Sequence, residues 1–171
     1  PPSKTVVLGD SVSLDINVSG LGVGMAPSIG TFDIDVGFDT RILDPTSVVF
    51  DTELDLFGFG SIQGAFGSGP VNVFEISLDL PSDLHDLQSD AFTLFTITFD
   101  TLAPGVSTIS LALNALGDSL GDPLAAELVD GRVEVASDGQ VPVPETLLLI
   151  AMGLLGIGAA RIRRCKVGFL C

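Results

Sequence analysis

The sequence predicts an all-β protein, an antiparallel jelly-roll sandwich of about nine strands, followed by a C-terminal hydrophobic helix. Apolar and polar residues alternate through most of residues 1–136, which is the period of half-buried strands. Only one short segment has helical spacing, so the strands do not alternate with helices as they would in a parallel α/β sheet. The helix is predicted because residues 146–160 are fifteen consecutive uncharged residues.

The first strands are predicted at residues 11–18 and 29–39. In the first, valines, leucine and isoleucine alternate with serines, Asp15 and Asn17. In the second, apolar side chains share one face, and Asp33 and Asp35 lie on the other. Asp44-Pro45 predicts a turn before a short strand at residues 47–50.

Glycine-rich residues 55–70 predict a long loop or an irregular edge. The next strand, residues 71–80, has an apolar face that we expect to be buried, opposite a polar face. The apolar face consists of Phe74, Ile76, Leu78 and Leu80, and the polar face consists of Glu75, Ser77 and Asp79.

Residues 81–90 have apolar residues only at helical spacing, which predicts a short helix with Ser82 as a possible N-cap. Residues 91–102 and 106–116 predict two more strands, and Phe95, Ile97 and Phe99 share one face of the first. A hairpin turning at Asp130-Gly131 would close the sandwich, followed by a polar linker at residues 137–140.

The charge pattern excludes one class of partner. Residues 1–140 carry 21 acidic and three basic residues, a net charge of −18, whereas residues 141–171 have a net charge of +3. An acidic body repels phosphate backbones, so we expect no nucleic-acid binding. Both cysteines, Cys165 and Cys171, are in the tail, so the body has neither a disulfide scaffold nor a thiolate metal site.

The sequence has no catalytic motif, and we predict no catalytic residue and no enzyme activity. His85 is the only histidine, has no nucleophile motif beside it, and is expected at the surface. Asp33 and Asp35 are two residues apart on one strand face, and a glycosidase-like pair is the alternative function for them. Without tryptophan or tyrosine the strand has no aromatic sugar platform of the usual kind.

No cofactor and no metal-binding residue is predicted, and calcium is the alternative left open. Asp118, Asp122 and Asp130 lie in or near loops, where carboxylates bind calcium, but they do not follow the twelve-residue loop pattern. Three phenylalanines in the glycine-rich region, Phe57, Phe59 and Phe66, predict either a contact surface or a cover for the open end of the core. We expect the cover.

The tail predicts a short transmembrane helix at residues 146–160. Such a helix spans about 22 Å, against a hydrocarbon core of about 30 Å. It is apolar on all sides, which makes a surface helix of the sandwich a poor fit. Arg161, Arg163 and Arg164 follow it as the expected membrane stop on the cytoplasmic side.

The order of proline motif, apolar helix and arginine cluster resembles the PEP-CTERM sorting signal of Gram-negative bacterial envelope proteins. The motif residues are Val141, Pro142, Val143, Pro144 and Glu145. The family has glutamate where this chain has Val143, and this chain continues after the arginines as CKVGFLC. The resemblance implies export, anchoring in the inner membrane and processing by an exosortase-type enzyme, followed by release to the cell surface or extracellular matrix.

The body resembles cohesin-like domains, on the segments GDSVSLDI, FDIDVGFD and DGRVEV among others. This resemblance implies a nine-stranded jelly-roll at residues 1–136, with a linker at 137–140 and the sorting tail at 141–171. It also implies a non-enzymatic module for protein binding or adhesion, with a dockerin-like or matrix protein as partner. The fold is related to carbohydrate-binding modules, so polysaccharide or exopolysaccharide binding is the alternative function.

Overall fold

A computed structural model of the protein describes residues 2–137, which contain nine strands and one short helix. The predicted helix at residues 146–160, the sorting motif, the arginine cluster and both cysteines lie outside the described residues. The elements are β1 (Ser3–Val7), β2 (Ser11–Ser19), β3 (Ile29–Gly37), β4 (Leu43–Phe50), β5 (Ile62–Phe66), β6 (Val71–Ile76), α1 (Pro81–Leu87), β7 (Ala91–Thr101), β8 (Gly105–Asp118) and β9 (Gly131–Ala136).

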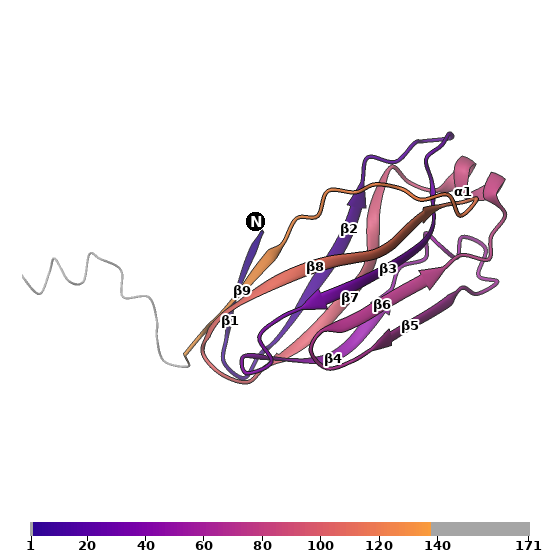
Figure 1. Ribbon diagram of the computed structural model, residues 1–171. Coiled ribbons are helices and arrows are strands. Elements are labelled where there is room, and N and C mark those ends of the chain that lie inside the picture. Colours follow the sequence, from indigo (N-terminus) through magenta and orange to yellow (C-terminus); the bar gives the residue numbers. More distant parts are fainter. Residues whose placement is uncertain (1, 138–171) are drawn as a thin grey trace, which may run out of the picture. The chain divides into compact units, whose positions relative to one another are not determined.

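The strands form two sheets that pack face to face (Figure 1). The larger sheet has the order β1-β9-β8-β3-β6-β5, and the smaller has the order β2-β7-β4. The predicted all-β sandwich is therefore confirmed. The pairing differs from the prediction in one place, since β1 pairs with β9 in parallel and the other paired strands of the described residues are antiparallel.

The core lies between the inner faces of the two sheets, as alternation predicts for β3 and β7. Phe32 and Phe95 are fully buried and stack across the core with ring centroids 5.8 Å apart. Phe38 meets buried Phe99 edge-on at 4.9 Å. Large aromatic rings bury much surface and dominate the energetics of protein cores, so these contacts help to hold the two sheets together.

The prediction of which face of β6 is buried is wrong. Val71, Val73 and Glu75 point into the core and are buried, whereas Phe74 is half-buried and Ile76 is exposed on the other side. The strand also ends at Ile76, so Leu78 and Leu80 lie beyond it. Both faces of this segment carry apolar residues, so alternation alone does not identify the buried one.

Two predicted turns are also wrong. Asp44-Pro45 lies inside β4, which is an edge strand, and the register shifts between Pro45 and Ser47. Edge strands and bulges tolerate proline because its missing N–H leaves no ladder bond unmade. The hairpin at Asp130-Gly131 does not form, because residues 124–130 before β9 are not a strand, and Asp130 accepts a hydrogen bond from the backbone N–H of Leu111.

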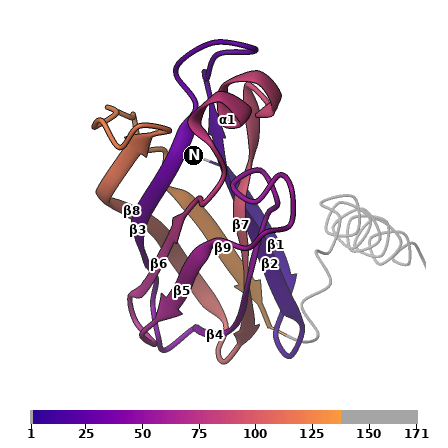
Figure 2. The ribbon, with the colours of Figure 1, turned by 90° about the vertical axis from the view of Figure 1, so that its right-hand side faces the viewer.

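The short helix is confirmed as α1, at one end of the sandwich (Figure 2). Its N-cap is Leu80 rather than Ser82, with proline in the first turn and no side-chain cap. Gln88, just after the helix, is buried, and its amide bonds the backbone of Ile29 and Glu53. The glycine-rich residues 55–70, predicted as a loop or an irregular edge, contain β5, an edge strand of the larger sheet.

Candidate binding face

The outer face of the larger sheet brings three rows of side chains into register across β5, β6, β3 and β8. One row is Ile62, Ile76, Thr31 and Gly117; the next is Gly64, Phe74, Asp33 and Ala115; the third is Phe66, Asn72, Asp35 and Ala112. The rows are apolar on β5 and polar on β3. We call Ile62, Phe66, Phe74 and Ile76 the platform, and Asp33, Asp35, Asn72 and Asn114 the polar row.

The platform is built around Gly64. The rings of Phe66 and Phe74 stack with centroids 6.0 Å apart and planes 19° from parallel. A Cβ at Gly64 would lie 2.9 Å from both rings, so glycine is needed for the rings to lie close over β5. The side chain of Phe66 is 63% exposed and that of Ile62 is 52% exposed, so neither belongs to the buried core.

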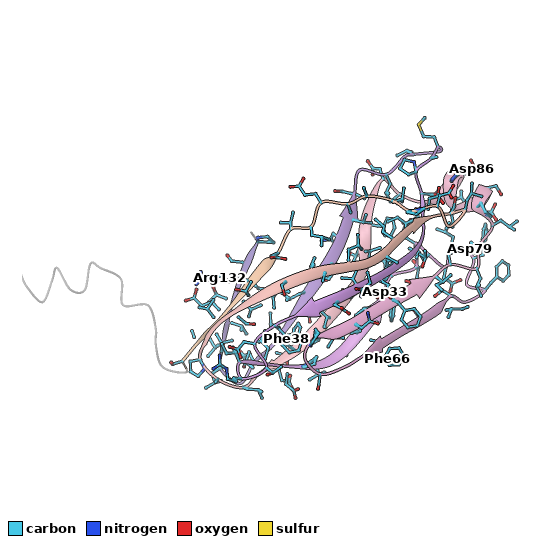
Figure 3. All side chains as sticks on the ribbon, viewed as in Figure 1. Asp33, Phe38, Phe66, Asp79, Asp86 and Arg132 are labelled. Carbon is cyan, nitrogen blue, oxygen red and sulfur yellow. The ribbon has the colours of Figure 1, made fainter. Side chains whose placement is uncertain are left out.

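The polar row is held together by amide groups from two neighbouring strands. Asn72 Nδ2 donates hydrogen bonds to Asp33 Oδ1 at 2.6 Å and to Asp35 Oδ1 at 2.8 Å. Asn114 Nδ2 donates to Asp33 Oδ1 at 3.1 Å. These bonds hold both carboxylates through their Oδ1 atoms. Figure 3 shows Asp33 and Phe66 on the same sheet.

A shallow depression of about 300 Å³ borders the polar row at Asp35 and Ser110, over Phe38. Together with the platform it makes a surface that is apolar at the edge strand and acidic towards the centre of the sheet. Exposed apolar patches with a polar rim mark interaction sites in soluble domains.

The glycine-rich phenylalanines do not cover the core, so that expectation is wrong. Phe57 is 50% exposed and Phe59 is 80% exposed, and their rings lie 5.9 Å apart in the loop before β5. Leu54, from the same loop, is the residue that enters the core. The alternative, a contact surface, agrees with these exposures.

The arrangement of Asp33 and Asp35 does not favour acid–base chemistry. The two carboxylates accept hydrogen bonds from one amide on an open sheet face, rather than facing each other across a cleft. His85 is half-buried rather than fully at the surface, and its Nε2 lies 2.8 Å from the hydroxyl of Ser119. Among the described residues, no hydrogen bond joins the His85 ring to a carboxylate.

Two of the three aspartates considered for calcium, Asp118 and Asp130, accept hydrogen bonds from the backbone. Asp118 Oδ1 accepts hydrogen bonds from the N–H groups of Leu120 and Asp122, and Asp130 Oδ1 accepts one from Leu111. Within residues 2–137, no group of three histidine, cysteine or acidic side chains is arranged to hold a metal ion.

A larger groove of about 1040 Å³ opens between the sheets, between β2 and β8. It forms because β9 pairs with only residues 105–109 of β8, which leaves Leu111, Leu113 and Leu116 half-buried. Its lining mixes leucines with polar and charged residues, among them Lys4, Asp15 and Glu127, and none of the residues that line it is aromatic. The outer face therefore remains the better candidate site.

Sequence reasoning identified Asp33, Asp35 and Phe66 but missed their partners. Asn72 and Asn114 carry no local signal, because they meet Asp33 only through pairing between strands distant in sequence. The alternation in residues 71–80 predicts Phe74 in the core. Its role on the outer face follows from the register that places it opposite Gly64.

The comparisons with known proteins cover both parts of the chain. The family model of the PEP-CTERM protein-sorting motif matches residues 140–164. No curated protein matches the chain. Of the helices in the part of the chain that the structure describes, none is long and apolar enough to span a membrane.

Solved cohesin structures match the fold. A chain of the type I cohesin–dockerin complex Coh-OlpA–Doc918 from Clostridium thermocellum matches with a TM-score of 0.64 at 15% identity, covering 79% of this chain and 95% of that one. The complex of the sixth cohesin from Acetivibrio cellulolyticus scaffoldin B with a Cel5 dockerin gives 0.64 at 18% identity, covering 79% and 95%. A non-cellulosomal cohesin from Archaeoglobus fulgidus gives 0.59 at 13% identity, covering 81% and 89%.

At these identities the likeness establishes the fold, and the sorting motif rests on the separate sequence match. The chain therefore combines a domain with the cohesin-like fold and, at residues 140–164, a PEP-CTERM protein-sorting motif.

Proposed function

We propose that this chain is an exported, non-enzymatic protein-binding module, and that its binding surface is the outer face carrying the platform and the polar row. The observation that carries the proposal is the exposure of Phe66 and Ile62 on a sheet whose inner face already packs a full core. Aromatic side chains at the centre of a patch supply most of the energy of a protein interface.

The cohesin-like fold supports a protein partner. Two of the matched structures are complexes between a cohesin and a dockerin, so their cohesins assemble with another protein. By this likeness the partner of the present domain is a dockerin-like or matrix protein. The acidic polar row favours a partner surface with basic or amide side chains beside an apolar patch.

The binding face is tested by a matched pair of truncations in the full chain. Phe66→Ala removes the platform's most exposed ring, and Val49→Ala removes an equally exposed apolar side chain, 63%, from β4 of the other sheet. The probes are the purified Doc918 dockerin and the extracellular matrix proteins of a bacterium with a PEP-CTERM system, quantified by mass spectrometry on the immobilised chain.

The expected result is a partner whose retention falls about tenfold or more with Phe66→Ala, which corresponds to about 1.4 kcal/mol, and is unchanged with Val49→Ala. A partner retained equally by the two variants binds elsewhere and contradicts the assignment of the face.

For the tail, the proposal is a sorting signal that anchors the chain in the inner membrane of a Gram-negative bacterium. An exosortase-type enzyme then cuts near residues 141–145, and the module reaches the cell surface or matrix. The match of residues 140–164 to the motif supports this. Arg161, Arg163 and Arg164 would act as the membrane stop.

Processing is tested by the mass of the mature protein in cells with and without the enzyme. We expect the mature protein to be lighter, by the mass of the tail, only in cells that contain the enzyme. A chain that keeps Cys171 in the envelope fraction of both cell types would mean permanent anchoring instead.

A second candidate function is polysaccharide binding on the same face. The observation that favours it is the pair of stacked rings of Phe66 and Phe74 beside the carboxylates of Asp33 and Asp35, since sugars use apolar faces and hydrogen-bonding hydroxyls together. Retention on cellulose, chitin or the bacterium's own exopolysaccharide, lost in Phe66→Ala, would support it. The absence of retention on all three would exclude it.

A further inference from the structure

Glu75 is a buried acidic residue, and neither the packing of the core nor the binding face explains why an acid stands at this position. It points into the sandwich from β6, and only 1% of its surface is exposed. The hydroxyl of Ser61 donates a hydrogen bond of 2.6 Å to Oε1, and Oε2 has no hydrogen-bond partner. A buried polar atom without a partner is rare in folded proteins and calls for an explanation.

The surroundings of Glu75 favour its neutral form. Burial raises the pKa of this carboxyl, the Ser61 hydrogen bond lowers it, and the negative charges of Asp55 and Asp51 raise it further. Its neighbours on the paired strands, Phe32 on β3 and Gln63 on β5, carry no titratable group. The ion pairs of the described residues involve Arg41 and Arg132, and neither includes Glu75.

Glu75 lies directly behind the platform. Its neighbours in the strand, Phe74 and Ile76, point to the outer face. Ser61 immediately precedes β5, so the bond between Ser61 and Glu75 joins the start of the edge strand to β6. β5 has five residues and pairs with β6 alone, so little else keeps it in place.

We propose that Glu75 is a proton-controlled latch for the binding face: protonated, it keeps β5 and residues 51–61 seated against β6, and ionised, it releases them. Ionisation in place would leave a charge buried with one hydrogen bond and two acidic neighbours, which costs more than moving the edge strand so that water reaches the carboxylate. Release of β5 separates Phe66 from Phe74. The consequence of the latch is that the face binds its partner best at low pH. This consequence rests on the proposed function.

The direction of the pH effect follows from the raised pKa. In the unfolded chain the carboxyl titrates near its ordinary value of 4.5, and in the folded chain it titrates higher. Below the unfolded value both states hold the proton, and the seated form keeps its full stability. As the pH rises through the folded value, that stability is lost.

The test is hydrogen exchange of the full chain, without any partner, at about pH 5 and about pH 8. After correction for intrinsic exchange rates, peptides covering residues 57–66 should lose protection about tenfold or more at the higher pH, and peptides from β7 should not. Glu75→Gln cannot ionise and should abolish the difference. Glu134→Gln, the same change at an exposed position, should keep it.

Two further measurements keep the proposal testable if Glu75→Gln does not fold. Carbon-13 NMR of the wild-type carboxyls should show one glutamate, Glu75, titrating well above the rest. Ser61→Ala removes a hydrogen bond that lowers the pKa, so the loss of protection should move to higher pH. Titration of Glu75 at its ordinary value, or an unchanged pH effect in Glu75→Gln, overturns the latch.

The proposal of the latch and the proposal of the binding face can be contradicted independently of each other. Exchange in the absence of a partner reports on the latch alone, and the Phe66→Ala comparison reports on the face alone. A pH-dependent β5 together with partner binding that ignores Phe66 would retain the latch and reject the face.

Discussion

Phe66 and Phe74 stack across Gly64, with their ring centroids 6.0 Å apart. The two rings come from neighbouring strands, β5 and β6, and both lie on the outer face of the larger sheet. The contact exists because the residue between them has no side chain. A small change at Gly64 therefore tests whether the platform has the geometry described.

Gly64→Ala is expected to separate the rings at little cost in stability. The new Cβ would lie 2.9 Å from the distal ring atoms of both phenylalanines, which can move outward. Alanine is favoured over glycine in a strand by about 0.5–1 kcal/mol, so the free energy of unfolding should change by less than about 1 kcal/mol. Nuclear Overhauser effects between the two rings measure their separation, and urea unfolding measures the change in stability.

The control for this change is Ala65→Gly, the reverse substitution at the next residue. It should lower stability slightly and leave the ring contacts unchanged. Ring contacts that persist in Gly64→Ala would show that glycine is not needed for the stack.

Gln88→Ala is expected to destabilise the α1 end of the sandwich by about 2–4 kcal/mol. The amide accepts a hydrogen bond of 2.6 Å from the N–H of Ile29 and donates to the carbonyls of Ile29 and Glu53. Removing it leaves these buried backbone groups unpaired. Ser89→Ala removes the exposed hydrogen bond from the Ser89 hydroxyl to Glu53 Oε1, keeps the one from the backbone N–H, and should cost less than about 1 kcal/mol in the same urea titration. Equal losses in the two variants would contradict this account.

Phe95→Ala is expected to cost about 3–5 kcal/mol of unfolding free energy. The ring is fully buried, stacks on Phe32 and lies near Phe50, so its removal leaves a cavity between the sheets. Phe59→Ala removes a ring that is 80% exposed and should change stability by about 0.5 kcal/mol or less. Thermal or urea unfolding compares them, and a large loss in Phe59→Ala would mean that this loop supports the core.

Asp39 is expected to titrate far below an ordinary aspartate. Arg41 donates two side-chain hydrogen bonds to its carboxylate, at 2.7 and 3.0 Å, and these, with a backbone bond, lower the pKa of Asp39 from 3.8 to about 2. Because the folded-state pKa is lowered, the stabilisation is present above the ordinary value and is lost as the pH falls through about 2. NMR titration of the carboxyl measures the midpoint. Arg41→Gln should return it towards 3.8, and an unchanged midpoint would contradict the pairing.

Much of the fold could be predicted because several strands bury one face only. In β2, β3 and β7 the apolar residues fall on alternate positions and the polar ones between them, so period and face follow from the sequence. α1 was predicted because its spacing changes after a proline. Pro45 predicts a turn, because a sequence does not show that the strand containing it lies at a sheet edge.

The candidate site was only partly predictable. Asp33, Asp35 and Phe66 stood out by their type and spacing, but Asn72 and Asn114 did not. Asn72 is 39 residues from Asp33, and Asn114 is 81 residues from it. Their hydrogen bonds depend on the register of β6 and β8 against β3, which local periodicity does not determine.

The sequence by itself determined that the body is a sandwich of strands with phenylalanine and aliphatic residues inside, and that the tail carries a sorting motif, because residue type, period and motif are local properties. Only the tertiary structure decided that Glu75 is buried and that Phe74 and Ile76 face outward. β6 has apolar residues on both faces, and pairing with β3 and β5 sets which face meets the other sheet. It also decided the place of β1, a short strand with little apolar alternation that is held by parallel pairing with β9.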